Sequence, residues 1–183
     1  MQIPDSIGIL NAWLPAAVYF ILNFAYLLLM PKYKVNAFIS VPRVKYISTL
    51  NHVLYYTFLF FCIFIPLKIG TVWIFVGLFF FSVGLFFYSF AMFSFAITEY
   101  NRPTIKGIYK HSRHPVYVSF FIIACGISIA SLSLVLISIA ILHFLLVLKL
   151  MNAEETECLN KYKTEYEIYI TQTNRIIQLK NKQ

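Results

Sequence analysis

The chain has 183 residues, of which 60% are hydrophobic and 12% are charged, whereas a soluble domain carries about 25% charged residues. This composition excludes an ordinary soluble domain. The net charge of +8 requires no nucleic-acid partner, because the basic residues lie between apolar segments, where anionic lipid headgroups attract them.

Five apolar segments follow one another along the chain, and uninterrupted apolar stretches near twenty residues long are typical of membrane spans. They do not alternate apolar and polar residues as barrel strands do, so helices are expected. The expected spans cover about residues 7–30, 50–67, 71–97, 116–131 and 134–151. The sequence therefore predicts an all-α polytopic membrane protein that forms a single domain over residues 1–183.

The first span ends at Pro31 and Lys32, and a polar connector over residues 31–49 leads to the second. The third span carries Gly77 and Gly84, small residues that let a neighbouring helix approach closely. Only a short serine-rich turn separates the fourth and fifth spans, which predicts a tight helical hairpin.

The segment 152–183 is polar and charged, and it carries Tyr162, Tyr166 and Tyr169 at helical spacing. This pattern predicts an amphipathic helix that lies on the membrane surface. The three cysteines of the chain are odd in number and widely spaced, without a CxxC pair. We therefore expect neither a disulfide framework nor a bound metal.

The basic residues indicate an orientation. Fourteen of the fifteen fall in the loops after the first and third spans or in and near the tail, and only Lys68 lies in a loop of the opposite set. Because basic loops stay in the cytoplasm, we expect the amino terminus outside and the carboxyl terminus inside, in the cell (inner) membrane.

A short polar segment over residues 106–117 separates the third and fourth spans. Pro115 suits the first turn of the fourth helix, whose free N–H groups attract anions. Arg113 offers paired donors for a carboxylate or phosphate, and His114 can move a proton near neutral pH. Taken singly, Arg113 has a simpler interpretation as a membrane-surface anchor and His114 as an interfacial residue.

Glu154 and Glu155, the only adjacent acidic pair in the chain, follow the apolar hairpin and are expected on the same membrane face as the polar segment. Their carboxylates can accept hydrogen bonds from an ammonium group or from ribose hydroxyls. The two patches together suit a ligand with carboxylate, ammonium and ribose groups, bound from the cytoplasm.

The motif Gly-x-Tyr followed by Arg-His-Pro-x-Tyr, then an apolar hairpin, Glu-Glu and a tyrosine-rich tail, resembles a known enzyme group. It is similar to the isoprenylcysteine carboxyl methyltransferases and phospholipid methyltransferases, integral membrane enzymes that use S-adenosylmethionine. The resemblance covers roughly residues 107–177. The matching positions are Gly107, Tyr109, Arg113, His114, Pro115, Tyr117, Glu154, Glu155, Leu159, Tyr162, Tyr166, Tyr169 and Arg175.

The resemblance implies S-adenosylmethionine as the cofactor and a lipid-like or prenylated small molecule as the acceptor. Cofactor binding is expected at Tyr109, Arg113, His114, Tyr117, Glu154 and Glu155. Catalytic roles are expected for His114, Glu155 and Arg175, with Arg175 nearer the methyl acceptor.

The chain departs from the family's pattern at a few positions. Ile108 stands where the family usually has proline, Ser119 where it often has glycine, and Lys163 where a glycine is common. No proline follows Arg175 where one is usual. None of these changes removes a charged group, so they bear on the acceptor side more than on the cofactor side.

Two other functions stay open from the sequence alone. Some sterol reductases, which use NADPH, are similar in their final spans. A small non-enzymatic membrane protein is the second alternative, although the spans lack the paired charges of an ion path. The sequence does not name the methyl acceptor or the oligomeric state.

Overall fold

The computed structural model describes residues 10–39 and 45–177, and in these ranges it is all-helical, as predicted. The expected start of the first span and the last six residues of the tail lie outside the described residues. The helices are α1 (Trp13–Leu29), α2 (Lys32–Ile39), α3 (Lys45–Phe64), α4 (Val72–Ala96), α5 (Pro115–Ala130), α6 (Leu134–Tyr162) and α7 (Thr164–Gln172), with a 3-10 turn η1 (Gly107–Lys110) before α5.

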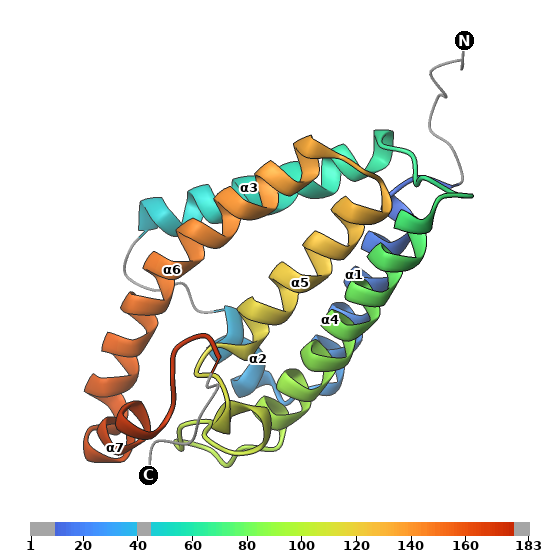
Figure 1. Cartoon of the computed structure of the whole chain (residues 1–183). Coiled ribbons are helices and arrows are strands. Elements are labelled where there is room, and N and C mark those ends of the chain that lie inside the picture. The colour runs from blue at the N-terminus through green and yellow to red at the C-terminus, as the bar shows by residue number, and fades with distance from the viewer. Residues whose placement is uncertain (1–9, 40–44, 178–183) are drawn as a thin grey trace.

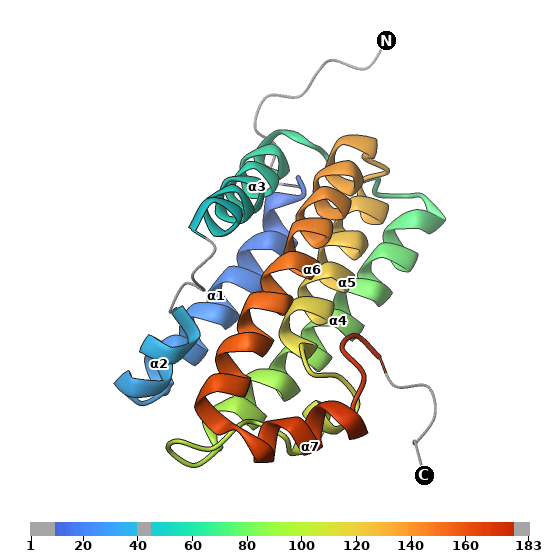
Figure 2. The same cartoon turned by 90° about the vertical axis from the view of Figure 1, so that its left-hand side faces the viewer.

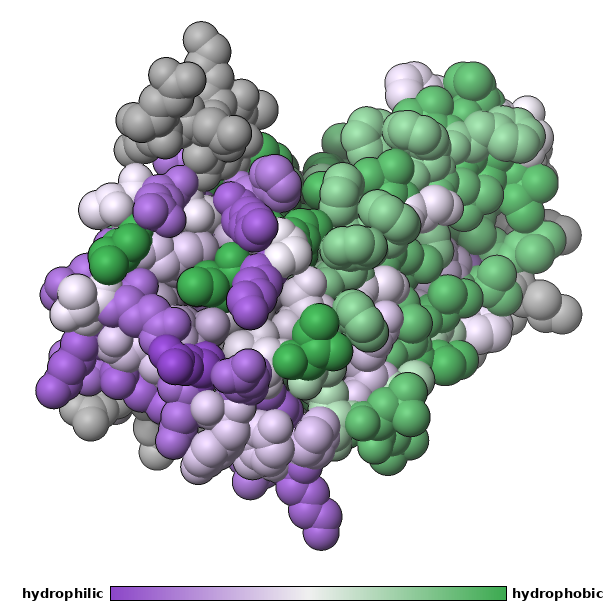
Figure 3. All heavy atoms as spheres, turned by 90° about the horizontal axis from the view of Figure 1, so that it is seen from below, coloured by the Kyte–Doolittle hydropathy of each residue, from purple (hydrophilic) through white to green (hydrophobic). Residues whose placement is uncertain are grey.

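The long helices form a bundle in which α5 lies between α4 and α6, while α3 packs along α6 (Figure 1). The predicted hairpin of the fourth and fifth spans is confirmed, because three residues join α5 to α6 and the two helices pack together. At one end of the bundle lie α2, η1, α7 and the loop after α4 (Figures 1 and 2). Hydrophilic residues gather at this end, whereas hydrophobic residues cover the rest of the visible face (Figure 3). We call it the polar end.

Within the described residues, three helices are long and apolar enough to cross a membrane: Tyr46–Phe64, Val72–Ala96 and Leu134–Tyr162. α1 and α5 are shorter apolar helices of 17 and 16 residues. At 1.5 Å per residue, 16 residues extend about 24 Å, less than the roughly 30 Å of a bilayer's hydrocarbon core. The expected number of five spans therefore stays a prediction.

Close packing of α4 on α5 depends on glycines, as Gly77 and Gly84 predicted. A Cβ atom at Gly84 would lie 2.9 Å from the backbone nitrogen of Ile123 on α5. A Cβ atom at Gly126 of α5 would lie 2.5 Å from the backbone nitrogen of Phe81 on α4. Small residues on both helices thus bring the two backbones together and fix α5 against α4.

The helix that carries the fifth apolar segment extends beyond that segment. α6 continues past residue 151 to Tyr162, because residues 152–162 contain good helix formers and neither glycine nor proline. The helix ends at Tyr162, and the φ of the next residue, Lys163, is 48°, in the left-handed region that a glycine adopts without strain. Lys163 therefore occupies a turn position whose backbone conformation would suit the glycine that is common there in the family.

α7 folds back against the protein at the polar end. Tyr166 and Tyr169 are buried with Tyr109 and Ala91 in one apolar cluster. The tail tyrosines therefore pack on the 3-10 turn and on α4, while the expected place of this helix on the membrane surface stays a prediction. This packing holds the tail beside the polar segment 106–117.

The α4–α5 contact gives a prediction for Gly84. Gly84→Leu should lower the stability of the detergent-solubilised protein by about 1–3 kcal/mol or more, because the new side chain overlaps Ile123. Ser82→Leu is the matched control, since Ser82 is exposed on the same helix and its replacement should change stability by less than about 0.5 kcal/mol. Thermal unfolding measures both. Equal melting temperatures for the two variants would contradict the close packing.

Candidate active site

The polar segment before α5 is held by the fold at both its ends. Gly107 opens η1 with a φ of 65°, and a Cβ atom there would collide with the hydroxyl of Ser94 on α4. Pro115 is the first residue of α5, as expected, and His114 directly precedes the helix. The hydroxyl of Tyr169 donates to the carbonyl oxygen of Tyr109 at 2.6 Å. The segment is therefore fixed between α4, α5 and α7.

The carboxylate of Glu155 lies at the centre of a buried charge cluster. Its Oε1 accepts from the Nε atoms of Arg113 and Arg175, each at 3.0 Å, and its Oε2 accepts from Nη2 of Arg175 at 2.6 Å. The Nε2 atom of His114 also lies 3.0 Å from Oε1. Only 8% of the Glu155 side chain is exposed. The predicted residues Arg113, His114, Glu155 and Arg175 are thus in direct contact.

Arg113 also ties the end of the described chain to this cluster. Its Nη1 donates to the carbonyl oxygens of Ile170 at 3.1 Å and Thr173 at 2.9 Å. Its backbone N–H donates to the carbonyl of Asn174 at 3.1 Å, and the hydroxyl of Ser112 donates to that of Arg175 at 3.2 Å. Most donors of this guanidinium therefore have partners within the protein, so its role in the structure is to hold the tail.

His114 lies between the two glutamates. Its Nε2 contacts Glu155, and its Nδ1 lies 3.4 Å from Oε2 of Glu154. Burial by itself lowers the pKa of His114, but the hydrogen bonds and charges of Glu154 and Glu155 outweigh burial and raise it above 6.5. With a carboxylate at each ring nitrogen, the imidazolium form is stabilised, and in that form His114 donates protons and does not accept them.

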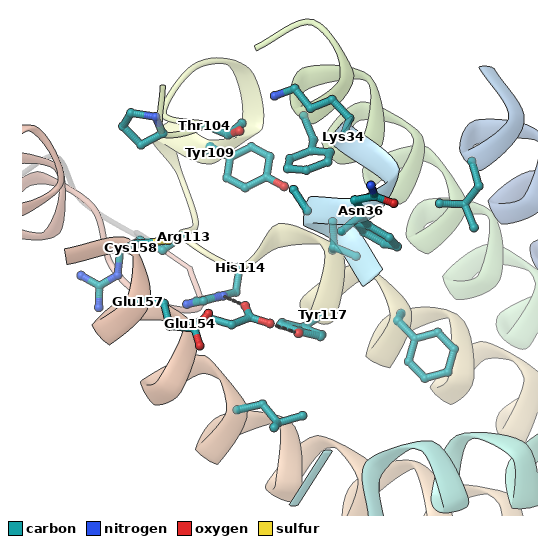
Figure 4. Close-up of a pocket in the computed structure, with 18 of the residues that line it drawn as sticks. Lys34, Asn36, Thr104, Tyr109, Arg113, His114, Tyr117, Glu154, Glu157 and Cys158 are labelled. Carbon is teal, nitrogen blue, oxygen red and sulfur yellow. Dashed lines mark hydrogen bonds and ion pairs between the residues drawn. The ribbon is translucent and has the colours of Figure 1, made fainter. Parts of the chain in front are cut away.

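Glu154 differs from its neighbour, because its side chain is 31% exposed. The hydroxyl of Tyr117 donates a hydrogen bond to its Oε1. In Figure 4, His114, Glu154 and Tyr117 point toward one another at the wall of a cavity. Glu154 therefore presents a carboxylate that is held in place by two neighbours and still reaches the cavity.

The cavity has a volume of about 900 Å³ and two chemically different parts. Tyr109, Arg113, His114, Tyr117 and Glu154 line its polar part, whereas Glu155 and Arg175 do not line it. The other part is lined by aromatic and aliphatic side chains of α1, α3 and α5, among them Phe20, Phe24, Leu27, Tyr55 and Phe120. One continuous space thus joins charged groups to an apolar wall.

The cavity is also lined by a buried basic residue that was not singled out from the sequence. Lys34 was counted only among the basic residues of the polar connector, but it lies on α2, lines the cavity and is buried. Lys34 lies on the short helix α2 inside that connector. The apolar patterns of the sequence did not predict this helix, so they gave no reason to single out Lys34.

The charge cluster gives a prediction for Glu155. Glu155→Ala leaves Arg113 and His114 buried without their counter-charge, so the protein should lose about 3–5 kcal/mol of stability. Glu167→Ala is the control, since Glu167 is exposed on α7 and its loss should cost less than about 0.5 kcal/mol. Thermal unfolding in detergent compares the two. A Glu155→Ala protein as stable as Glu167→Ala would show that the cluster does not hold the fold together.

A comparison with protein families identifies the family of this chain. A family model described as phospholipid methyltransferase matches residues 69–165, more than half of the chain. No curated protein and no solved structure matched. The matched residues include α4, η1, α5, and α6 with both glutamates, so they contain the polar part of the cavity except for the tail. The resemblance noted in the sequence is therefore confirmed: the chain belongs to the phospholipid methyltransferase family and is an integral membrane protein of this methyltransferase kind.

Proposed function

We propose that the chain is an S-adenosylmethionine-dependent methyltransferase that acts on a hydrophobic or amphipathic acceptor, either a phospholipid amine or a carboxyl group like that of an isoprenylcysteine. The observation that carries this proposal is the single cavity of about 900 Å³ with a charged part and an apolar part. In such a space a polar cofactor can bind beside the charged groups while a lipid-like acceptor binds against the apolar wall.

The polar part of the cavity fits the proposed cofactor by its chemistry. Glu154 offers a carboxylate for an ammonium group or for ribose hydroxyls, and Tyr109 and Tyr117 add aromatic walls. S-adenosylmethionine supplies a methyl group on a sulfonium, which is reactive without a metal. Residues of the chain therefore have to bind, to orient and to exclude water.

Within this proposal, His114, Glu155 and Arg175 form a positioning set. Glu155 and Arg175 do not line the cavity, and their contacts with Arg113 and His114 set the position of the polar wall. Direct contact of Glu155 with the cofactor, which the resemblance implied, stays a prediction.

The two acceptor chemistries make different demands on proton transfer. An amine acceptor has to lose a proton, and Glu154 is the glutamate of the adjacent pair that lines the cavity. A carboxylate acceptor needs no base. In both cases the acceptor's apolar tail would lie against Phe20 and Phe24 of α1, which line the same cavity.

The proposed cofactor gives a direct test by calorimetry on detergent-purified protein. S-adenosylmethionine and its demethylated product should bind, and NADPH should not. Glu154→Gln should weaken S-adenosylmethionine about ten- to a hundredfold, because a charge-assisted hydrogen bond is lost. Glu167→Gln, which changes an exposed residue of α7, should leave the affinity unchanged. Binding of NADPH alone to folded protein would favour a reductase and overturn the proposal.

We also propose that the amino terminus faces outward and that the polar end of the bundle faces the cytoplasm, in the cell (inner) membrane. The loop of Lys68 contacts the end of α5, through a hydrogen bond from its N–H to the carbonyl of Ala130 at 2.9 Å. Lys110 lies at the start of α5, so the two exposed lysines are at opposite ends of that helix.

Single cysteines in a cysteine-free background test this orientation in intact cells. Lys68→Cys should react with a membrane-impermeant maleimide from outside, and Lys110→Cys should react only after permeabilisation. Lys163→Cys, at the turn before α7, should behave like Lys110→Cys. Labelling of the Lys68 and Lys110 variants from the same side would contradict the proposed topology.

A further inference from the structure

Lys34 is a buried cation in the wall of the cavity. It lies on α2, only 5% of it is exposed, and its Nζ lies 4.8 Å from the ring centroid of Phe95 on α4. Among the ion pairs that the structure describes within residues 10–39 and 45–177, none includes Lys34. The face of an aromatic ring is therefore the contact of its charge that the structure describes.

The surroundings of Lys34 disfavour its charged form. Burial and, second, the positive charge of Lys161 lower the pKa of Lys34. A buried charge is costly unless a counter-charge and hydrogen bonds accompany it, and a ring face compensates only part of that cost. Lys161 also lines the cavity, and so do Glu99, Glu154 and Glu157. Lys161 is the group whose charge acts on the pKa of Lys34, and an anion between the two ammonium groups would offset their repulsion.

Lys34 lies on a different wall from the glutamates. In Figure 4 its side chain lies near Tyr109 on one side of the cavity, whereas Glu154 and Tyr117 lie on the other. Phe24 and Leu27 of α1 line the cavity as well, and Phe38 of α2 packs on Phe95. The ammonium therefore lies where apolar walls adjoin the polar part of the cavity.

The family match separates these two walls. Residues 69–165 contain the polar segment before α5 and both glutamates, but they leave out α1, α2 and α3. The cofactor groups proposed above, Tyr109, Tyr117 and Glu154, lie inside the match, and Lys34 lies outside it. The wall that carries Lys34 is thus distinct from the part of the cavity assigned to the cofactor.

We propose that Lys34 binds an anionic group of the methyl acceptor, a phosphate or a carboxylate, and so determines which amphiphiles are accepted. This inference rests on the proposed function, because it assigns the remainder of the cavity to the acceptor. An acceptor of this kind places its apolar tail against α1 and its anion between Lys34 and Lys161. Neutral amphiphiles of the same tail length lack the group that Lys34 recognises.

The test measures binding of three probes to purified protein in an uncharged detergent. The probes are dioctanoyl phosphatidylethanolamine, which carries a phosphate, N-acetyl-S-farnesylcysteine, which carries a carboxylate, and the neutral dioctanoylglycerol. Three variants are compared with the wild type: Lys34→Met, Lys34→Arg and Lys32→Met. Lys32 is exposed and lies two residues away on the same helix, so it controls for loss of one positive charge. S-adenosylmethionine affinity and thermal unfolding are measured for every variant.

The wild type should bind at least one of the two probes that carry an anionic group more tightly than dioctanoylglycerol. Lys34→Met should weaken that probe by about tenfold or more, because a charge-assisted contact is lost, while S-adenosylmethionine affinity stays unchanged. Lys34→Arg should keep most of the affinity, and Lys32→Met all of it. The anionic probe that loses affinity identifies the anion as phosphate or carboxylate.

Three results would overturn the proposal: no preference of the wild type for an anionic probe, an equal loss in Lys32→Met, or a loss of S-adenosylmethionine affinity in Lys34→Met. The last would place Lys34 at the cofactor. Failure of the wild type to bind S-adenosylmethionine would count against the proposed function and would leave the probe comparison interpretable, since it requires no methyl transfer.

Discussion

The buried carboxylate of Glu155 is the interaction on which the polar end of this protein depends. It joins Arg113 and His114, which precede α5, to Arg175 in the tail. Because a buried charge needs compensation from every side, all three elements have to be in place together. Arg113 extends the same network to the backbone of the tail. The position of His114, and through it that of Glu154, follows from this cluster.

Because α6 is one continuous helix, the side chains of the adjacent Glu154 and Glu155 point to different surroundings. Successive residues on a helix point about 100° apart, so one carboxylate turns toward the charge cluster and the other toward the cavity. Glu155 is buried among cations, and Glu154 is partly exposed and held by Tyr117 and His114. Since α6 is also long and apolar enough to cross a membrane, the polar wall is built on a rigid continuation of a membrane helix.

The cavity is lined partly by helices inside the family match and partly by helices outside it. The matched residues carry its polar part, while α1, α2 and α3 add apolar walls and the buried Lys34. The proposed division places the cofactor against the matched part and the acceptor against the remainder. In this proposal the acceptor is selected by helices that lie outside the family match.

The sequence by itself determined the helical class, the apolar segments, the close approach at Gly77 and Gly84, and the pairing of the polar segment with Glu154 and Glu155. These features follow from local composition and spacing, which fix helices and the residue types they carry. Only the tertiary structure decided that Glu155 faces cations while Glu154 faces the cavity, and that Tyr166 packs on the protein. It also decided that Lys34 is buried. Contacts such as Arg113 with Glu155, 42 residues apart, depend on how helices pack, and no local pattern encodes that packing.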